Sequence, residues 1–374
     1  MKYPVLKGAQ EEQTDLNMSA PGSVTTAVSN ASVSNQNMTN PARERSTDLI
    51  FILVYSVLFL VGLVLNSFTL WFHCCQPQRN ASKSLMIYLK NLTAADFLLC
   101  LSLPLRIIHY ATKPATIHLL YCSFGASILF LNMYASILFM GYIALNRYFK
   151  VVRPFGAFFL LTKRAAYITS MTTWVFLLTP MTAYSTVLLK TLKSNGSEDI
   201  CEDLQSDSVK LIYRTLHIGA SAIFLLVFFS MLFSYYSASR RVLQAQQRQS
   251  TSFSSKKLQK SRRKMLVLIC IFCICFIPYH LIRLLYTFLQ QLGSSDRVFY
   301  YLMEFTTIVS VLNVCLDPLV YFVFCKDFRV HLRLSLRRVR MENEARRSNE
   351  EQLRSINLSH NGTLSTSSRS TGEV

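Results

Sequence analysis

The sequence predicts an all-α membrane protein, a seven-transmembrane helix bundle followed by a short amphipathic eighth helix. Of its 374 residues, 51% are hydrophobic and only 16% are charged, and the apolar residues are grouped in blocks. The first block, 49–72, has 24 residues without a charge or a proline, enough to cross a hydrocarbon core of about 30 Å. Seven such blocks are too many for the buried core of a soluble domain. The other six are 85–108, 118–149, 165–189, 211–238, 265–289 and 298–324.

The distribution of basic residues predicts the orientation of the bundle. If the first span runs from outside to inside, the loops after spans 1, 3 and 5 hold 2, 5 and 9 Lys or Arg residues, and those after spans 2, 4 and 6 hold 1, 3 and 1. Basic loops stay on the cytoplasmic side. We therefore expect a multi-pass plasma-membrane protein with its N-terminus outside. The net charge of +19 then reflects topology and contact with anionic membrane lipid, not nucleic-acid binding.

Polar tails flank the membrane domain, which is expected at 49–325. Residues 1–48 are rich in Ser, Thr, Asn and Gln and are expected to form a disordered extracellular tail. This tail lacks the apolar segment of a cleavable signal peptide, so the first span would act as the anchor. It carries three sequons for N-glycosylation, which begin at Asn17, Asn30 and Asn37.

The region after the last span is expected to divide into two parts. In 326–340, Phe328, Leu332 and Leu336 recur every four residues between arginines, which favours an amphipathic helix in the membrane interface. The alternative is a solvated basic segment. Residues 341–374 are expected to form a disordered cytoplasmic tail rich in Ser and Thr.

The chemistry-bearing residues do not fit an enzyme. The sequence has no glycine-rich phosphate loop and no HExxH motif, and its seven histidines are scattered. Instead, ionisable residues stand inside the spans, where each is costly enough to suggest a function: Asp96, Arg147 and Asp317.

Several residues within the spans follow a recognisable order. Asn146-Arg147-Tyr148 ends the third span, and Asp317-Pro318-Leu319-Val320-Tyr321 lies in the seventh. This set resembles the motifs of the rhodopsin-like family of G-protein-coupled receptors over about residues 49–332, with Asn146 in place of an aspartate and Phe276 in place of a tryptophan. The remaining matches are Asn66, Asp96, Trp174, Phe272, Cys275, Pro278 and Asn313.

The resemblance implies signalling to a heterotrimeric G protein by outward movement of helix 6, with Pro278 as the hinge. Arg147 would then reach the G protein, and Tyr236 and Tyr321 would swing inward. The inhibitory class of G protein is expected, with arrestin and receptor kinases acting at the C-terminal tail. The residues expected to serve activation are Asn146, Arg147, Tyr148, Tyr236, Phe272, Phe276, Pro278, Asp317, Pro318 and Tyr321.

Polar residues in the middle of the bundle can converge on a sodium ion, the only bound ion or cofactor that we expect. Two neighbouring carboxylates repel each other unless a cation or a proton intervenes. The alternative is a hydrogen-bonded polar core without an ion. The residues are Asp96, Asn132, Ser136, Asn313 and Asp317.

The cysteines are expected to include one disulfide. The resemblance implies a bond between Cys122, at the outer end of span 3, and Cys201, in the second outer loop, in an oxidising compartment. The other eight cysteines lie in spans or on the cytoplasmic side and are expected to be thiols.

Basic residues near the outer ends of the spans suggest an anionic ligand. Arg106 and Arg283 stand about one to two turns inside their spans, and the arginine fork suits phosphate or carboxylate. The alternative is that each arginine extends to the headgroups or pairs with Glu304. The expected ligand-binding residues are Arg106, Tyr110, Arg214, His280, Arg283 and Glu304, with Tyr134 and His217 close by.

The stretch CFIPYHLIRLLYT, with His280 and Arg283, is similar to the purinergic nucleotide receptors and the related lysophospholipid receptors. Nucleotide receptors usually have Lys or Gln before the helix 7 glutamate, where this chain has Met303. They also have a second disulfide, for which residues 1–73 and 276–314 offer no cysteine. A lysophospholipid is therefore at least as suitable as a nucleotide, with its acyl chain among Phe124, Ile128, Leu129 and Phe130.

Two other functions remain open at this level. Five acidic residues between 198 and 207 would suit a peptide ligand of the chemokine type. A non-signalling seven-helix protein is disfavoured by the intact Arg147, Pro278 and DPLVY motif.

Overall fold

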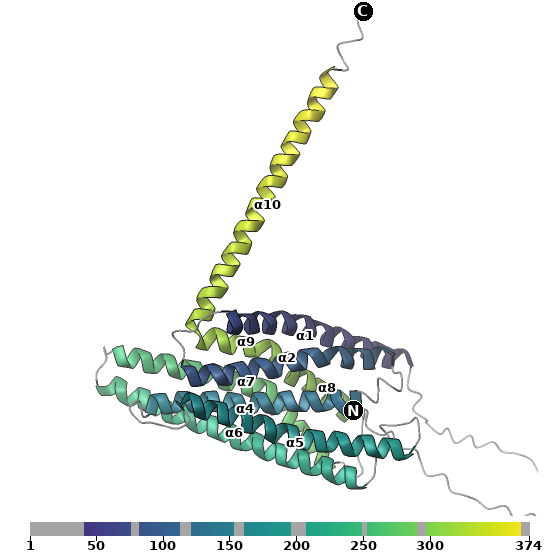
Figure 1. Cartoon of the computed structure of the whole chain (residues 1–374), viewed down its shortest axis with the longest axis vertical. Coiled ribbons are helices and arrows are strands. Elements are labelled where there is room, and N and C mark those ends of the chain that lie inside the picture. The colour runs from purple at the N-terminus through teal and green to yellow at the C-terminus, as the bar shows by residue number, and fades with distance from the viewer. Residues whose placement is uncertain are drawn as a thin grey trace, which may run out of the picture.

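The computed structural model describes residues 41–75, 82–112, 121–152, 161–195, 207–248, 253–289 and 297–367. The regular structure in these ranges is helical, and the helices up to residue 324 lie lengthwise beside one another in a bundle (Figure 1). They are α1 (Pro41–Cys75), α2 (Lys83–Thr112), the π-helical turn η1 (Tyr121–Gly125), α4 (Ala126–Val152), α5 (Lys163–Asn195), α6 (Asp207–Arg248), α7 (Phe253–Leu289), α8 (Arg297–Val311), α9 (Asn313–Phe324) and α10 (Lys326–Ser367).

Six stretches in the described residues are long and apolar enough to cross a membrane: 46–75, 83–112, 127–152, 214–244, 259–286 and 298–324. The remaining predicted span is α5, which is less apolar because Ser and Thr are frequent in it. Several of its hydroxyl groups donate to its own backbone, as Thr173 Oγ1 does to the Thr169 carbonyl at 2.8 Å and Thr179 Oγ1 to the Val175 carbonyl at 2.8 Å. Such bonds satisfy a hydroxyl inside an apolar environment.

α4 forms the centre of the bundle, and α1 lies at its edge. Within the most apolar window of each helix, 72% of the α4 residues are buried but only 22% of the α1 residues. Phe139, Met140 and Ile143 of α4 are fully buried in the main core cluster. α5 is attached to this core by Trp174, whose Nε1 donates to Asn91 Oδ1 of α2 at 2.8 Å.

The last span consists of α8 and α9, which are separated at Leu312. Pro318 in α9 has no N–H group, so the carbonyl of Val314 loses its partner within the helix. Asn66 of α1 donates to this carbonyl at 2.9 Å and to that of Gly62 at 2.9 Å. A Cβ on Gly62 would lie 2.6 Å from Val314 Cγ1, so this close approach requires glycine.

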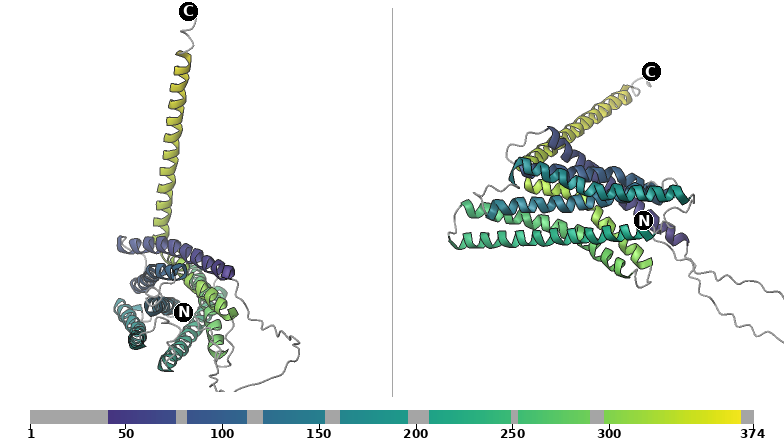
Figure 2. Two further views of the ribbon diagram at one scale, coloured as in Figure 1. Left: turned by 90° about the vertical axis from the view of Figure 1, so that its right-hand side faces the viewer. Right: turned by 60° about the horizontal axis from the view of Figure 1, so that its bottom comes forward.

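The amphipathic helix expected at 326–340 is the first part of the longer helix α10, which continues to Ser367. Residues 341–367 are therefore helical, and the expectation of a disordered tail is wrong for them. Figures 1 and 2 show α10 extending away from the bundle. Ion pairs one turn apart support its continuation: Arg340 bonds Glu344 at 2.9 Å, and Arg346 bonds Glu342 at 3.0 Å.

Some of the predicted sites lie outside the described residues. These are the sequons at Asn17, Asn30 and Asn37, and Cys201. Cys122 belongs to η1, but its side chain is not among those described, so the disulfide stays a prediction. The other eight cysteines are free thiols in the structure.

Candidate functional site

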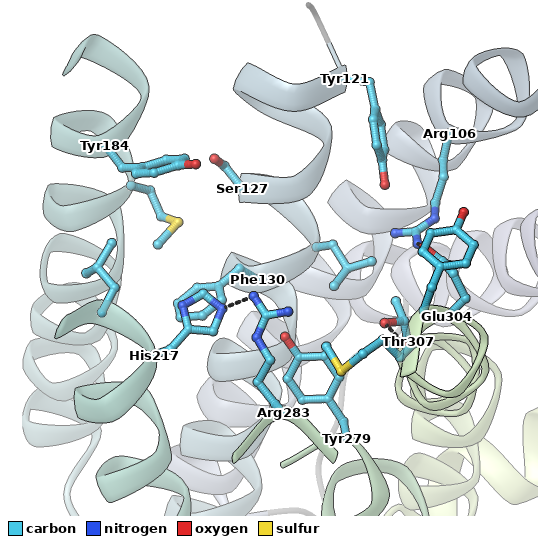
Figure 3. A pocket seen from close by; sticks show the side chains of 15 residues that line it. Arg106, Tyr121, Ser127, Phe130, Tyr184, His217, Tyr279, Arg283, Glu304 and Thr307 are labelled. Carbon is cyan, nitrogen blue, oxygen red and sulfur yellow. Dashed lines mark hydrogen bonds and ion pairs between the residues drawn. The ribbon is translucent and has the colours of Figure 1, made fainter. Parts of the chain in front are cut away.

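The bundle contains a pocket at the end opposite α10, which we call the pocket end. The pocket and the open solvent at its mouth together span about 800 Å³. Its wall combines aromatic and apolar side chains with three charged ones (Figure 3). The lining residues are Arg106, Tyr121, Ser127, Leu129, Phe130, Met181, Tyr184, Leu216, His217, Tyr279, Arg283, Tyr300, Met303, Glu304 and Thr307.

One side of the pocket is formed by a buried ion pair. Arg106 Nη2 lies 2.8 Å from Glu304 Oε2 and 3.1 Å from Oε1, and only 7% and 9% of the two side chains are exposed. The Tyr55 hydroxyl donates to Glu304 Oε2 at 3.3 Å, and its ring centroid lies 4.6 Å from the guanidinium carbon of Arg106. Pairing with Glu304, the alternative considered for both arginines, therefore holds for Arg106, which is fixed by a carboxylate and an aromatic ring.

The other side of the pocket is formed by Arg283 and His217. Arg283 Nη2 donates to His217 Nε2 at 2.5 Å, which joins α7 to α6 (Figure 3). An accepting Nε2 requires the neutral imidazole. His217 is therefore neutral, and this bond does not itself offset the charge of the guanidinium.

His280 lies one turn below Arg283 on α7 and is not part of the pocket lining. Its Nδ1 bonds the Phe276 carbonyl at 2.8 Å, so its Nε2 accepts from the Tyr134 hydroxyl at 3.0 Å. The Phe224 ring of α6 stacks on the imidazole, with centroids 3.9 Å apart. His280 thus connects the floor of the pocket to the aromatic core between α4, α6 and α7.

The structure brings together three of the six predicted ligand residues, Arg106, Arg283 and Glu304. Tyr110 is buried behind the ion pair, where its ring stacks on Tyr55 at 6.1 Å. Arg214 is exposed and lies outside the pocket lining, because α6 turns His217 rather than Arg214 toward α7.

Sequence reasoning missed the tyrosines of the wall, among them Tyr279 and Tyr300. The spacing of these tyrosines from the charged residues could have indicated them. Tyr279 precedes Arg283 by four residues and Tyr300 precedes Glu304 by four, so each pair shares one helix face.

The expected polar core lies in the middle of the bundle and is fully buried. Asn132 Nδ2 donates to Asp96 Oδ1 at 3.1 Å, and Asn313 Nδ2 donates to Ser136 Oγ at 3.1 Å. The carboxyl groups of Asp96 and Asp317 are direct neighbours. Within the described residues, four of the acceptor oxygens receive no hydrogen bond from a protein donor: Asp96 Oδ2, Asp317 Oδ1 and Oδ2, and Asn313 Oδ1. This donor set fits a hard cation such as sodium, which prefers oxygen ligands.

The expected activation residues lie toward the opposite end of the bundle, the α10 end. Asn146 Nδ2 donates to Ser84 Oγ of α2 at 2.9 Å, and the Arg147 guanidinium lies 5.0 Å from the ring centroid of Phe324. The Tyr321 hydroxyl bonds the Leu89 carbonyl and Thr93 Oγ1. Tyr236 faces outward and is exposed.

The remaining activation residues lie on α4, α7 and α9. Phe272 and Phe276 are buried, with ring centroids 5.3 Å apart. Pro278 lies within α7 and Pro318 within α9. Tyr148 packs against Phe233 of α6 at 5.9 Å.

Comparison with known proteins places this architecture in one family. The family model described as 7 transmembrane receptor (rhodopsin family) matches residues 65–321. Purinoceptor 14 of Bos taurus is 31% identical over 296 residues, which are 77% of this chain and 86% of that protein. G-protein coupled receptor 87 of Mus musculus is 32% identical over 287 residues (75% and 78%), and the probable G-protein coupled receptor 34 of the same species is 30% identical over 318 residues (82% of both). The chain therefore belongs to the rhodopsin family of seven-transmembrane receptors, in its purinergic and lysophospholipid branch, and is a multi-pass membrane receptor rather than an enzyme.

Proposed function

We propose that the chain binds a small anionic extracellular ligand in the pocket and activates heterotrimeric G proteins. The observation that carries this proposal is the charge of the pocket wall. Among the described lining residues, two arginines and one glutamate carry charge, so the cationic groups outnumber the carboxylate. A cation in a partly dry pocket favours a ligand of opposite charge, and an arginine fork matches phosphate.

The remaining wall suits the rest of such a ligand. Leu129, Phe130, Met181 and Leu216 provide an apolar surface for an acyl chain, whereas the tyrosines can stack on a nucleobase. The purinoceptor name of one relative, that of Bos taurus, supports a nucleotide. The absence of a cysteine for a second outer disulfide supports a lysophospholipid.

A response panel in transfected cells tests the proposal. Nucleotides, lysophospholipids and chemokines are applied separately, and calcium and cyclic AMP are recorded against cells that lack the receptor. We expect a receptor-dependent response to one of the two anionic small-molecule classes. A response to chemokines alone would favour the peptide-receptor alternative, and no response to any class would count against ligand-driven signalling.

We propose that the signal crosses the membrane by movement of α7, which corresponds to helix 6 of the family. Its Pro278 would act as the hinge, and the α10 end of α7 would move outward to let a G protein reach Arg147. The loops after spans 1, 3 and 5 hold most of the Lys and Arg residues between the spans. This distribution supports an extracellular N-terminus and a cytoplasmic α10 end in the plasma membrane. The inhibitory class of G protein, and arrestin and receptor kinases at the Ser/Thr-rich tail, belong to the same proposal.

The polar core is proposed to hold a sodium ion in the resting state. Asp96, Asp317 and Asn313 would provide the oxygens that lack a protein donor, and Asn132 and Ser136 would orient them. When bound, the cation would neutralise the repulsion between the two carboxylates.

Asn146→Asp is expected to lower signalling in the absence of ligand about fivefold. Aspartate cannot donate to Ser84 as Asn146 Nδ2 does, but it would accept a hydrogen bond from the Ser84 hydroxyl instead and would add a negative charge beside Arg147. About 1 kcal/mol of added resting-state stability lowers a minor active population roughly fivefold, since about 1.4 kcal/mol is a factor of ten. Ligand-free G-protein activation is measured at matched expression. The control is Asn343→Asp, the same change at an exposed position of α10. Equal basal activity in wild type and Asn146→Asp would reject the idea.

A further inference from the structure

Helices α4, α5 and α7 contain no acidic residue. Residues 97–197 and 208–295 contain no Asp or Glu. These ranges include all of α4, α5 and α7, and all of α6 except Asp207 at its pocket end. An ion pair between Arg147 and an acid on α7 therefore cannot hold that helix in place, and the restraint must come from other groups.

Phe324, the last residue of α9, lies at the centre of the contacts that replace such a pair. Its side chain is buried, and two cations lie within cation–π distance of its ring. The Arg147 guanidinium of α4 is 5.0 Å from the ring centroid, and the Lys264 ammonium of α7 is 5.3 Å from it. The ring of Phe324 thus contacts both the helix that carries the G-protein arginine and the helix proposed to move.

The backbone at the end of α9 binds the same lysine. The last carbonyls of a helix have no partner within it and carry a partial negative charge. Lys264 Nζ donates to the Phe324 carbonyl at 3.2 Å. Arg329 Nη1 of α10 donates to the two preceding carbonyls, those of Phe322 at 3.0 Å and Val323 at 3.1 Å. Of the two capping cations, only Lys264 comes from a neighbouring span.

We propose that Lys264 is a positioning residue for activation: through Phe324 it holds the α10 end of α7 against α9 in the resting receptor. This inference rests on the proposed function, because it assumes that outward movement of α7 is the activating step. Such movement would withdraw Lys264 from the carbonyl and from the ring together. The lysine would thereby restrain α7, which has no acidic residue of its own to pair with Arg147.

Electrostatic repulsion opposes this contact, so the direction in which α7 moves when Lys264 is removed tests the proposal. Arg147, Arg329 and Lys260 are like charges close enough to repel Lys264. Removal of Lys264 would relieve that repulsion and would favour the closed position if repulsion dominated. We expect the direct contacts to dominate, because a charge-assisted hydrogen bond acts at short range while repulsion between partly hydrated groups is screened.

The experiment compares Lys264→Met with Lys260→Met in the full-length receptor in lipid nanodiscs without ligand. Lys260 is exposed on the same helix one turn away, so its replacement is the matched control. Spin labels at exposed positions 75 of α1 and 263 of α7 report the distance between the two helix ends, with Cys74 and Cys270 replaced by serine. Nucleotide exchange on an added G protein reports basal activity.

Lys264→Met is expected to increase the share of long distances between the labels and to raise ligand-free exchange about fivefold. Lys260→Met removes only a screened repulsion and is expected to leave both close to the wild-type values. Lys264→Arg retains both the positive charge and a donor and is expected to resemble wild type. If the methionine variant does not fold, Lys264→Gln removes the same charge and is expected to give the same increase.

The outcomes separate this inference from the proposed function. Equal distances in Lys264→Met and Lys260→Met, or shorter ones in Lys264→Met, overturn the role of Lys264. If wild type then still activates the G protein, the proposed function stands. Longer distances in Lys264→Met, with no G-protein response from any variant, support the restraint and count against the proposed function.

Discussion

Arg283→Ala is expected to lower agonist potency at least tenfold while the receptor remains folded and at the cell surface. Arg283 lines the pocket, and its bond to the neutral His217 does not cancel its charge. Loss of a charge-assisted hydrogen bond costs about 1.5–3 kcal/mol, and about 1.4 kcal/mol corresponds to a factor of ten in affinity.

The measurement is a concentration–response curve for whichever nucleotide or lysophospholipid activates the receptor. Arg214→Ala is the control, because Arg214 is an exposed arginine on the neighbouring α6 outside the pocket lining. Arg283→Lys should give an intermediate potency, since it keeps the charge but loses the fork. The same potency in Arg283→Ala and Arg214→Ala would contradict the anion site.

Glu304→Gln is expected to destabilise the receptor severely rather than to alter ligand binding selectively. Its carboxylate is the counterion of Arg106, and both groups are buried. Removal of one partner leaves an uncompensated buried charge, which costs about 3–5 kcal/mol. Thermal unfolding of the purified receptor and its surface expression measure the loss.

An exposed pair on α10 offers the matched control for this change. Glu342 bonds Arg346 at 3.0 Å, with side chains 60% and 73% exposed, so Glu342→Gln should change stability by about 0–1 kcal/mol. The double variant Arg106→Met/Glu304→Leu should recover most of the stability lost in Glu304→Gln, because a buried ion pair can be replaced by apolar residues at little cost. Similar melting temperatures for Glu304→Gln and Glu342→Gln would show that the Arg106–Glu304 pair is not essential for stability.

The sequence alone predicted the helical spans because length and apolar composition decide whether a segment can cross a membrane. It also predicted seven spans, including α5, whose hydroxyl groups lower its hydropathy but bond its own carbonyls. The length of α10 was underestimated. The apolar repeat ends near residue 340, and the later helical turns depend on exposed ion pairs such as Arg340–Glu344.

The pairing of the charged residues was decided only by the tertiary structure. The sequence offered Arg106 and Arg283 as equivalent anion sites, with Glu304 as a possible partner of either. Glu304 bonds Arg106 because α8 places it beside α2, whereas α7 turns Arg283 toward His217 of α6. The rotation of each helix about its axis is set by packing against its neighbours. The sequence therefore determined which residues carry charge into the membrane, and the fold determined how those charges are paired around the pocket.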